Sequence, residues 1–199
     1  HGIFQTRADG ASQPHALTQS KALQNPGSFT PDGKRLAYLE VARNIQIWTV
    51  LLEDQGGQVR AGKPEPWLKN SFDDANPVFS LDGRWLAYQS NESGKYEVYV
   101  RAFASSSSGP GAKWQISNSG GSGARWSRSG PELVYRSGDQ LMTARYTVTG
   151  DRFVAEKPRV WIARLGGSVW DLAPDGRRVA VLTPVEPVTT SVQEHQVVI

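Results

Sequence analysis

Apolar and polar residues alternate along short stretches of this chain, and turn residues separate the stretches. Tyr96–Val100 reads Tyr-Glu-Val-Tyr-Val, and Ile45–Val50 reads Ile-Gln-Ile-Trp-Thr-Val. Side chains of a β-strand point alternately to its two faces, so this period of two predicts short strands with one buried face each. Asp-Gly, as at Asp82-Gly83, lies between such stretches and favours a tight hairpin, because glycine accepts the positive φ of the turn. The pattern predicts an all-β chain of antiparallel hairpins.

One ten-residue pattern occurs four times. Phe29–Tyr38 reads FTPDGKRLAY, and it returns as FSLDGRWLAY at Phe79–Tyr88, as WSRSGPELVY at Trp126–Tyr135 and as LAPDGRRVAV at Leu172–Val181. Self-similarity at a nearly constant spacing is the signature of a repeat architecture. Each unit has the same order of elements: an apolar strand, a tight turn that is Asp-Gly in three of the four units, a second strand, a polar turn, a third alternating strand and a shorter fourth strand, such as Trp114–Ser117.

Four short antiparallel strands in each repeat describe one blade of a β-propeller. We therefore predict an all-β fold in which residues 1–199 form a single β-propeller region of about four four-stranded antiparallel blades. A β-sandwich is the alternative, and it is disfavoured because a sandwich has no reason to repeat its turn chemistry at a fixed spacing. The expected units span about residues 25–70, 71–118 and 122–165, and a fourth unit is split between 168–199 and 1–20.

The split unit allows two architectures. Ile3–Thr6 and His15–Thr18 read as outer strands, whereas Ser168–Thr183 reads as two inner strands, so the two ends complement each other. Together they could complete a fourth blade and close a small ring. Alternatively the chain is part of a larger propeller, which the missing initiator Met favours. An open arc would expose unpaired strand edges, so we expect the ends to pair within one molecule or to mediate self-association.

The repeat resembles that of a known family. Phe79–Tyr88, followed by Ser90–Val100 (SNESGKYEVYV), is similar to the WD40-like repeat of TolB-type bacterial propellers. Gln5–Gly10, Tyr96–Phe103 and Trp114–Ser117 further resemble the propeller that lies C-terminal to the catalytic domain in many bacterial serine/threonine protein kinases.

The resemblance implies a non-catalytic module that binds or senses a protein, a peptide or a small ligand in the channel, and that is attached to a signalling kinase. Two alternatives stay open: the substrate-gating propeller of a prolyl-oligopeptidase-type peptidase, and a TolB-like periplasmic translocation component. The resemblance favours a periplasmic or other extracytoplasmic location, with a cytoplasmic one also open. A kinase catalytic loop upstream in the parent gene, or a G-x-S-x-G domain downstream, would separate these functions.

Composition excludes several classes of protein. The chain of 199 residues has no cysteine, which excludes disulfides and thiol catalysis. Its net charge is +3, and its basic residues are scattered rather than gathered in the dense patch of a nucleic-acid-binding surface, so we expect no nucleic-acid partner. No apolar run is long enough to span a bilayer, so we expect no membrane span.

The sequence does not group residues for catalysis or cofactor binding. Gly120–Ala124 (GGSGA) approaches the G-x-S-x-G elbow of serine hydrolases, but it ends in alanine. The three histidines, His1, His15 and His195, lie near the ends and lack zinc-binding spacing. The glycine-rich loop, catalytic loop and Asp-Phe-Gly motif of kinases are absent as well. We predict that this chain has no enzymatic activity, catalytic residue, cofactor or metal site.

Recurrence of one residue type at equivalent positions indicates a structural role. An Asp side chain in a tight turn accepts hydrogen bonds from nearby backbone amides, and the following Gly supplies the positive φ. This assigns a structural turn role to Asp32, Gly33, Asp82, Gly83, Asp175 and Gly176. One second-strand position is apolar in all four units and should be buried, namely Leu36, Leu86, Leu133 and Val179.

Candidate contact residues are those that break the repeat or that recur on one rim. Trp85 stands where the other units have Arg35, Glu132 and Arg178, so we expect position 85 to face outward or toward a neighbouring rim. An exposed tryptophan there would be a contact residue, and the alternative is that it covers a neighbouring blade. Arg35 and Arg178 follow Asp-Gly turns and are further candidates.

Overall fold

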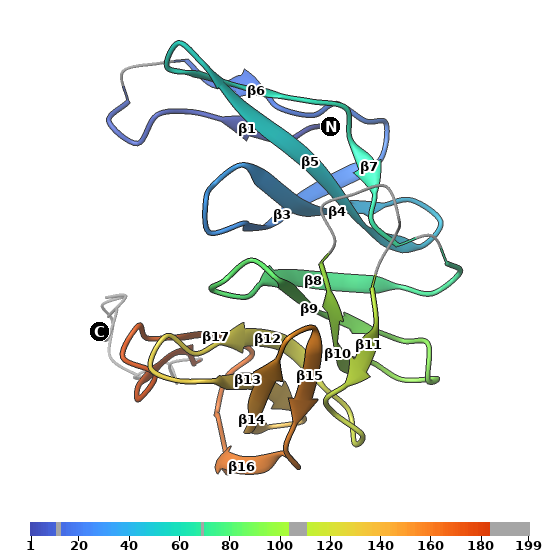
Figure 1. Ribbon diagram of the computed structural model, residues 1–199, viewed down its shortest axis with the longest axis vertical. Coiled ribbons are helices and arrows are strands. Elements are labelled where there is room, and N and C mark those ends of the chain that lie inside the picture. Colours follow the sequence, from blue (N-terminus) through green and yellow to red (C-terminus); the bar gives the residue numbers. More distant parts are fainter. Residues whose placement is uncertain (11–12, 69, 104–110, 184–199) are drawn as a thin grey trace, which may run out of the picture.

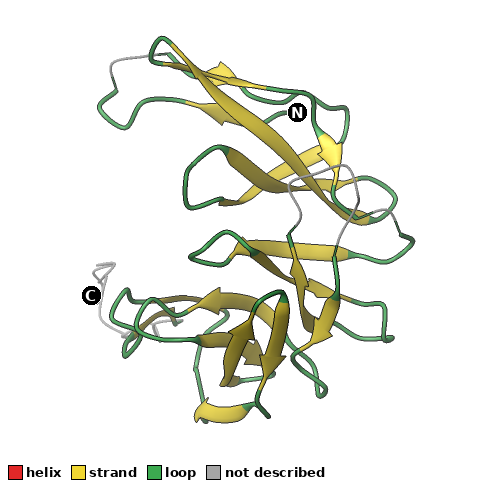
Figure 2. Ribbon diagram, in the orientation of Figure 1, coloured by secondary structure: helices red, strands yellow, loops and turns green. Residues whose placement is uncertain are grey.

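The computed structural model describes residues 1–10, 13–68, 70–103 and 111–183, and the regular elements of these residues are all β-strands (Figure 2). No described residue belongs to a helix, so the described chain offers no helix that could cross a membrane. The strands are β1 (Phe4–Gln5), β2 (His15–Ala16), β3 (Leu23–Phe29), β4 (Arg35–Val41), β5 (Ile45–Gln55), β6 (Gln58–Ala61), β7 (Glu65–Pro66), β8 (Asp74–Phe79), β9 (Trp85–Ser90), β10 (Glu97–Ala102), β11 (Lys113–Gln115), β12 (Ser122–Trp126), β13 (Glu132–Ser137), β14 (Gln140–Thr149), β15 (Arg152–Ala155), β16 (Arg159–Ile162), β17 (Val169–Leu172) and β18 (Val179–Leu182).

Three antiparallel sheets stack side by side, and each is one blade (Figure 1). Blade I has the strand order β3-β4-β5-β6, with β7 also paired to β5. Blade II has the order β8-β9-β10-β11, and blade III has the order β12-β13-β14-β15, with β16 also paired to β14. The innermost strand β8 contacts both β3 and β12, so the inner strands of neighbouring blades lie together. The strands of the three blades run from Leu23 to Pro66, from Asp74 to Gln115 and from Ser122 to Ile162.

The two ends of the described chain lie at opposite ends of this arc (Figure 1). Among the described residues, β1 pairs with β2 and β17 pairs with β18, in separate two-stranded sheets. These residues form an open arc, the second of the two architectures expected from the sequence, and the split fourth blade stays a prediction. Residues 184–199, with His195 and the rest of the expected fourth unit, lie outside the described residues.

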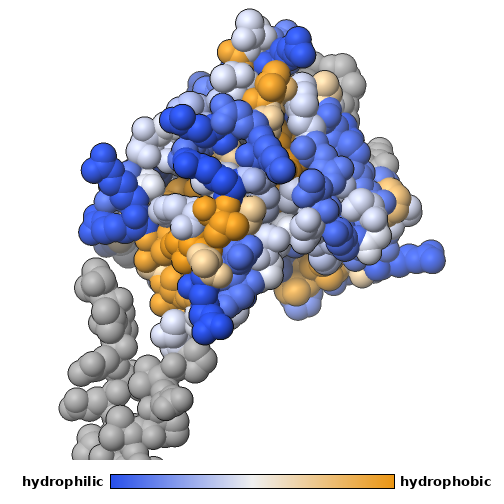
Figure 3. All heavy atoms as spheres, turned by 90° about the horizontal axis from the view of Figure 1, so that it is seen from below, coloured by the Kyte–Doolittle hydropathy of each residue, from blue (hydrophilic) through white to orange (hydrophobic). Residues whose placement is uncertain are grey.

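The end of the arc formed by β16, β17 and β18 exposes apolar side chains (Figure 3). Val160, Val169 and Leu182 are 49%, 60% and 68% exposed. Exposed apolar surface beside an unpaired strand edge is a surface on which another strand or blade can pack. Self-association through blade edges therefore stays a prediction for this end.

Apolar side chains fill the interface between each pair of neighbouring sheets. Because side chains alternate along a strand, consecutive residues of β4 enter different interfaces: Leu36 faces the β1–β2 pair, and Ala37 faces blade II. The buried members of the four interfaces are Ile3, Leu17, Leu36, Tyr38, Val50 and Leu52; Ala37, Ile47, Trp67, Leu68, Phe79, Leu86, Tyr88 and Tyr99; Trp85, Ala87, Val98, Val100, Ile116, Ala124, Trp126, Leu133, Tyr135, Ala144 and Phe153; and Val134, Leu141, Leu165 and Trp170.

The repeated second-strand position is buried in the three complete blades. Leu36, Leu86 and Leu133 are at most 1% exposed. Val179, at the equivalent position of β18, is only half-buried. Each leucine is covered by the neighbouring sheet that its side chain faces, whereas Val179 packs only partly against the cluster of Val134 and Leu141 in blade III.

Candidate functional site at the channel mouth

The carboxylates of the repeated turns are engaged within their own turns. Asp82 Oδ1 accepts hydrogen bonds from the Arg84 amide at 3.1 Å and from the Ser80 hydroxyl at 2.5 Å. Asp32 and Asp175 make the equivalent bonds to the amides two residues further on. The Thr30 hydroxyl and then the Lys34 amide stabilise the charged form of Asp32 and lower its pKa. These bonds stabilise the turns.

Turns of neighbouring blades lie side by side at one rim. Gly83 has a φ of +71°, and a Cβ atom there would lie 3.1 Å from Pro31 Cδ in blade I. Gly176 has a φ of +66°, and a Cβ atom there would overlap the Ser129 hydroxyl of blade III. Glycine at these positions allows both the turn geometry and the close approach of the next turn.

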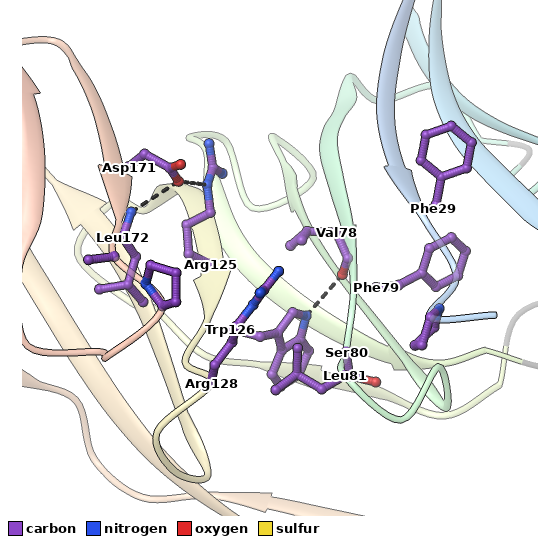
Figure 4. A pocket seen from close by; sticks show the side chains of 13 residues that line it. Phe29, Val78, Phe79, Ser80, Leu81, Arg125, Trp126, Arg128, Asp171 and Leu172 are labelled. Atoms are coloured by element: carbon purple, nitrogen blue, oxygen red, sulfur yellow. Dashed lines mark hydrogen bonds and ion pairs between the residues drawn. The ribbon is translucent and has the colours of Figure 1, made fainter. Parts of the chain in front are cut away.

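A pocket of about 560 Å³ opens beside these turns, and all four repeat units line it (Figure 4). We call it the channel-mouth pocket. Two repeat positions provide most of its walls, because inner strands of neighbouring blades lie side by side. The position that ends each inner strand contributes Phe29, Phe79, Trp126 and Leu172, and the position two residues later contributes Pro31, Leu81, Arg128 and Pro174.

Charged residues enter the pocket where the repeat is broken. Arg125 and Asp171 occupy the position that is Ser28 and Val78 in the other units, and Arg125 Nε lies 3.2 Å from Asp171 Oδ1. Arg128 replaces the proline of two other units, is exposed, and forms no hydrogen bond or ion pair with a described residue. In Figure 4, Arg125 and Arg128 lie between Leu172 on one side and the phenyl rings of Phe29 and Phe79 on the other. The pocket therefore combines one unneutralised guanidinium with an apolar wall.

Hydrogen bonds between blades hold the apolar floor of the pocket. Trp126 Nε1 donates to the Val78 carbonyl oxygen at 3.0 Å, which links blade III to blade II. The Phe79 amide donates to the Ser28 hydroxyl at 2.9 Å, which links blade II to blade I. Phe29 and Leu81 are 55% and 53% exposed, so the rim also offers apolar surface to a partner.

No family model and no curated protein matches this chain. Solved structures do match it. TolB from Acinetobacter baumannii has a TM-score of 0.55 and 21% identity over 91% of this chain. A protein with a provisional TolB assignment from Agrobacterium tumefaciens has a TM-score of 0.54 and 18% identity over 77% of this chain. The fold is a β-propeller.

The similarity extends to other bacterial proteins at lower identity. A protein provisionally assigned as a 6-phosphogluconolactonase from Bacteroides uniformis has a TM-score of 0.51 and 13% identity over 81% of this chain. The chain spans 42% of the Acinetobacter structure, 55% of the Agrobacterium structure and 49% of the Bacteroides structure. At these identities the comparison establishes the propeller fold and its all-β blades, and nothing finer.

Trp85 is a core residue of the propeller, so of the two roles left open for it, an exposed contact residue or the cover of a neighbouring blade, only the second fits its place. It is 2% exposed and lies on the same face of β9 as Ala87, which points toward blade III. Its ring packs at 5.3 Å from Phe153 of blade III and at 5.4 Å from Trp114 of blade II. The charged residues at the equivalent positions suggested that position 85 is exposed. A long charged side chain at a strand end can reach solvent even from an otherwise buried face, so its presence does not show that the position itself is exposed.

The two candidate arginines lie on the turn rim but not together. Arg35 begins β4 and is half-buried between blades I and II, where its guanidinium carbon lies 6.0 Å from the ring centre of Phe103. Arg178 is exposed beside β18, and its Nε donates to Asp175 Oδ2 at 2.8 Å within its own turn. Arg178 is therefore already neutralised, whereas Arg35 faces a separate cleft.

Sequence reasoning missed the residues that line the channel-mouth pocket. Arg125, Arg128 and Asp171 occupy positions where the aligned repeat changes chemical character, and that change was the available signal. Sequence alone did not show that these positions face one another. Among the described residues, no group of three or more histidine, aspartate or glutamate side chains could hold a metal ion.

Proposed function

We propose that this propeller is a non-catalytic binding module whose channel-mouth pocket takes an extended segment of a partner protein. The proposal rests on the convergence of all four repeat units into one pocket. The residues that break the repeat there, Arg125, Arg128 and Asp171, are the ones that give the pocket its charge.

The chemistry of the pocket favours a segment with an acidic group beside an apolar side chain. Arg128 has no partner among the described residues, so its guanidinium is available for a carboxylate, which it can bind with two parallel hydrogen bonds. The rings of Phe79 and Trp126 offer a rigid apolar floor. Aromatic and arginine side chains of this kind contribute much of the binding energy in protein interfaces.

Selection from a displayed library of random peptides tests the proposal. Peptides selected on the unaltered chain should be rich in acidic and apolar residues, and they should bind the Arg128→Glu variant at least tenfold more weakly. The Leu81→Asp variant should weaken them as well. Arg164→Glu makes the same charge change at an exposed arginine outside the pocket and serves as the control. Equal affinity for all four proteins would show that the pocket is not the binding site.

The attached domain is the finer part of the proposal. We propose that the propeller belongs to a bacterial serine/threonine protein kinase, on the sequence resemblance of Tyr96–Phe103 and Trp114–Ser117. The peptidase and translocation alternatives share the same fold. Sequencing the parent gene distinguishes them: a kinase catalytic loop before His1 supports the proposal, and a hydrolase domain after Ile199 contradicts it.

Absence of catalysis is a separate expectation. Ser122 lies in blade III, whereas His15 lies in the N-terminal strand pair, where its Nε2 is 2.9 Å from the Val59 carbonyl oxygen. The purified chain should neither hydrolyse esters or peptides nor transfer phosphate from ATP. Hydrolysis that disappears in a Ser122→Ala variant would contradict this expectation.

A further inference from the structure

A second cleft lies between blades I and II on the rim that carries the repeated turns. It has a volume of about 430 Å³ and shares only Pro31 with the channel-mouth pocket. We call it the inter-blade cleft. Blade I lines it with Lys34, Arg35 and Leu51, and blade II lines it with Arg84 and Phe103.

The equivalent place in the next interface of the propeller is occupied by aromatic side chains. There Trp85 occupies the position of Arg35, and Phe153 and Trp114 pack against it. The side chain of Arg35 does not fill the space between blades I and II in this way. The same repeat position thus carries arginine at the inter-blade cleft and tryptophan at the next interface.

Arg35 is held in place while part of its guanidinium stays available. Its Nη1 donates to the Thr49 hydroxyl at 3.2 Å, and its guanidinium carbon lies 6.0 Å from the ring centre of Phe103. No other hydrogen bond or ion pair joins the guanidinium to a described residue. An arginine fixed by a ring and a hydroxyl loses little conformational freedom when it binds an anion.

Three cations, Lys34, Arg35 and Arg84, and two carboxylates, Asp32 and Asp82, line the cleft, so its lining carries a net charge of +1. Lys34 is exposed, and its ammonium group forms no hydrogen bond or ion pair with a described residue, although its charge also acts on Asp32. The carboxylates that line the cleft, Asp32 and Asp82, accept hydrogen bonds within their own turns. Arg84 interacts with the Gly150 carbonyl oxygen and with Asp151 of blade III, so Lys34 and Arg35 are the cations left for a ligand.

The other walls of the cleft are apolar. Leu51 is 38% exposed, and Pro31 and Phe103 lie beside it. We infer that the inter-blade cleft binds a carboxylate attached to a flat apolar group. Arg35 and Lys34 receive the carboxylate, and Leu51 and Phe103 contact the apolar body. Such a carboxylate can belong to a free small acid or to the C-terminal residue of a peptide.

Nuclear magnetic resonance of the ¹⁵N-labelled chain tests the inference with two acids and their neutral amides. The probes are 3-phenylpropionate and N-acetyl-glycyl-phenylalanine, each compared with its amide. The acids should shift the amide signals of Arg35, Leu51 and Phe103 saturably, and the amides should bind at least tenfold more weakly. The acid that binds more tightly identifies the source of the ligand. No saturable shift with either acid, or equal binding of acid and amide, would overturn the inference.

Variants separate this site from the channel-mouth pocket. Arg35→Gln should weaken the tighter acid at least tenfold, and Arg35→Lys should weaken it less because the charge remains. Lys34→Gln, a change at an exposed side chain that leaves the fold intact, should weaken binding of the tighter acid severalfold, whereas the control Lys63→Gln should not.

Arg128→Glu, in the channel-mouth pocket, should leave binding of this acid unchanged, which makes failure of this site distinguishable from failure of the proposed function. Unaltered binding in both Arg35→Gln and Lys34→Gln would overturn the inference.

Discussion

Trp126 Nε1 donates a hydrogen bond to the carbonyl oxygen of Val78, 3.0 Å away. The two residues belong to the inner strands of neighbouring blades, and both line the channel-mouth pocket. One contact therefore stabilises a blade interface and also fixes the floor of the candidate binding site.

Replacing this indole tests how much the contact contributes. Trp126→Phe should lower the free energy of unfolding by about 1 kcal/mol more than Trp67→Phe. Both tryptophans are buried, but the Trp67 indole nitrogen has no hydrogen-bond partner among the described residues. Urea denaturation followed by circular dichroism measures both values. Equal losses would show that the bond to Val78 adds nothing to stability.

Leu86 and Leu81 contrast a buried and an exposed leucine in one repeat. Leu86 is 0% exposed, whereas Leu81 is 53% exposed in the turn. Leu86→Ala should lower the free energy of unfolding by about 2–5 kcal/mol because it leaves a cavity. Leu81→Ala should change it by less than about 0.5 kcal/mol. The same denaturation experiment compares them, and an unchanged midpoint for Leu86→Ala would show that the repeat position is not part of the core.

Asn76 has a left-handed backbone, with a φ of +51°, at the irregularity between Ala75 and Val78 in β8. A β-branched residue is strained in this conformation, and glycine is not. Asn76→Val should therefore lower the free energy of unfolding by about 1–2 kcal/mol, whereas Asn76→Gly should lower it less despite losing the hydrogen bond to Gln89. Equal stability of the two variants would argue against strain at this position.

Asp74 should make stability depend on pH. It is 1% exposed, and burial raises the pKa of its carboxyl group against the opposing hydrogen bonds from Ser90 and Asn70. The folded chain therefore binds this proton more readily than the unfolded chain does. The contribution of Asp74 to stability is greatest below the unfolded pKa of about 4 and falls as the pH rises through the folded pKa.

The stability of Asp74→Asn relative to the unaltered chain should accordingly increase between pH 4 and pH 7. Asp32→Asn provides a control of opposite sign. The pKa of Asp32 is lowered, so its stabilising contribution is present above the unfolded value and is lost as the pH falls through the folded value. Denaturation at several pH values measures both trends, and the same trend for both variants would refute this assignment.

The N-terminal strand pair should protect blade I rather than the other end of the arc. Ile3 and Leu17 pack with Leu36, Tyr38 and Val50. Deleting residues 1–18 should speed hydrogen exchange in β4 and β5 and leave Val179–Leu182 unchanged. Faster exchange at Val179–Leu182 alone would mean that the two ends pair in solution.

The sequence by itself predicted the strands, the blades and the buried leucines, because these depend on patterns within one repeat. Alternation places Leu36, Leu86 and Leu133 on a buried face, and Asp-Gly sets the hairpin before the first two. The same reasoning left two roles open at Trp85, exposed contact or cover of a neighbouring blade. Whether that side chain is covered depends on Phe153, which belongs to the next blade.

Only the tertiary structure decided where the candidate sites lie and how the arc ends. The channel-mouth pocket joins Phe29, Phe79, Trp126 and Leu172, which the chain separates by whole repeats and which the stacking of inner strands brings together. The inter-blade cleft depends on Arg35 of one blade and Phe103 of the next. The ends of the chain complement each other in pattern, but among the described residues β1–β2 and β17–β18 form separate two-stranded sheets. Local patterns specify each blade, whereas contacts between blades specify what the assembled surface can bind.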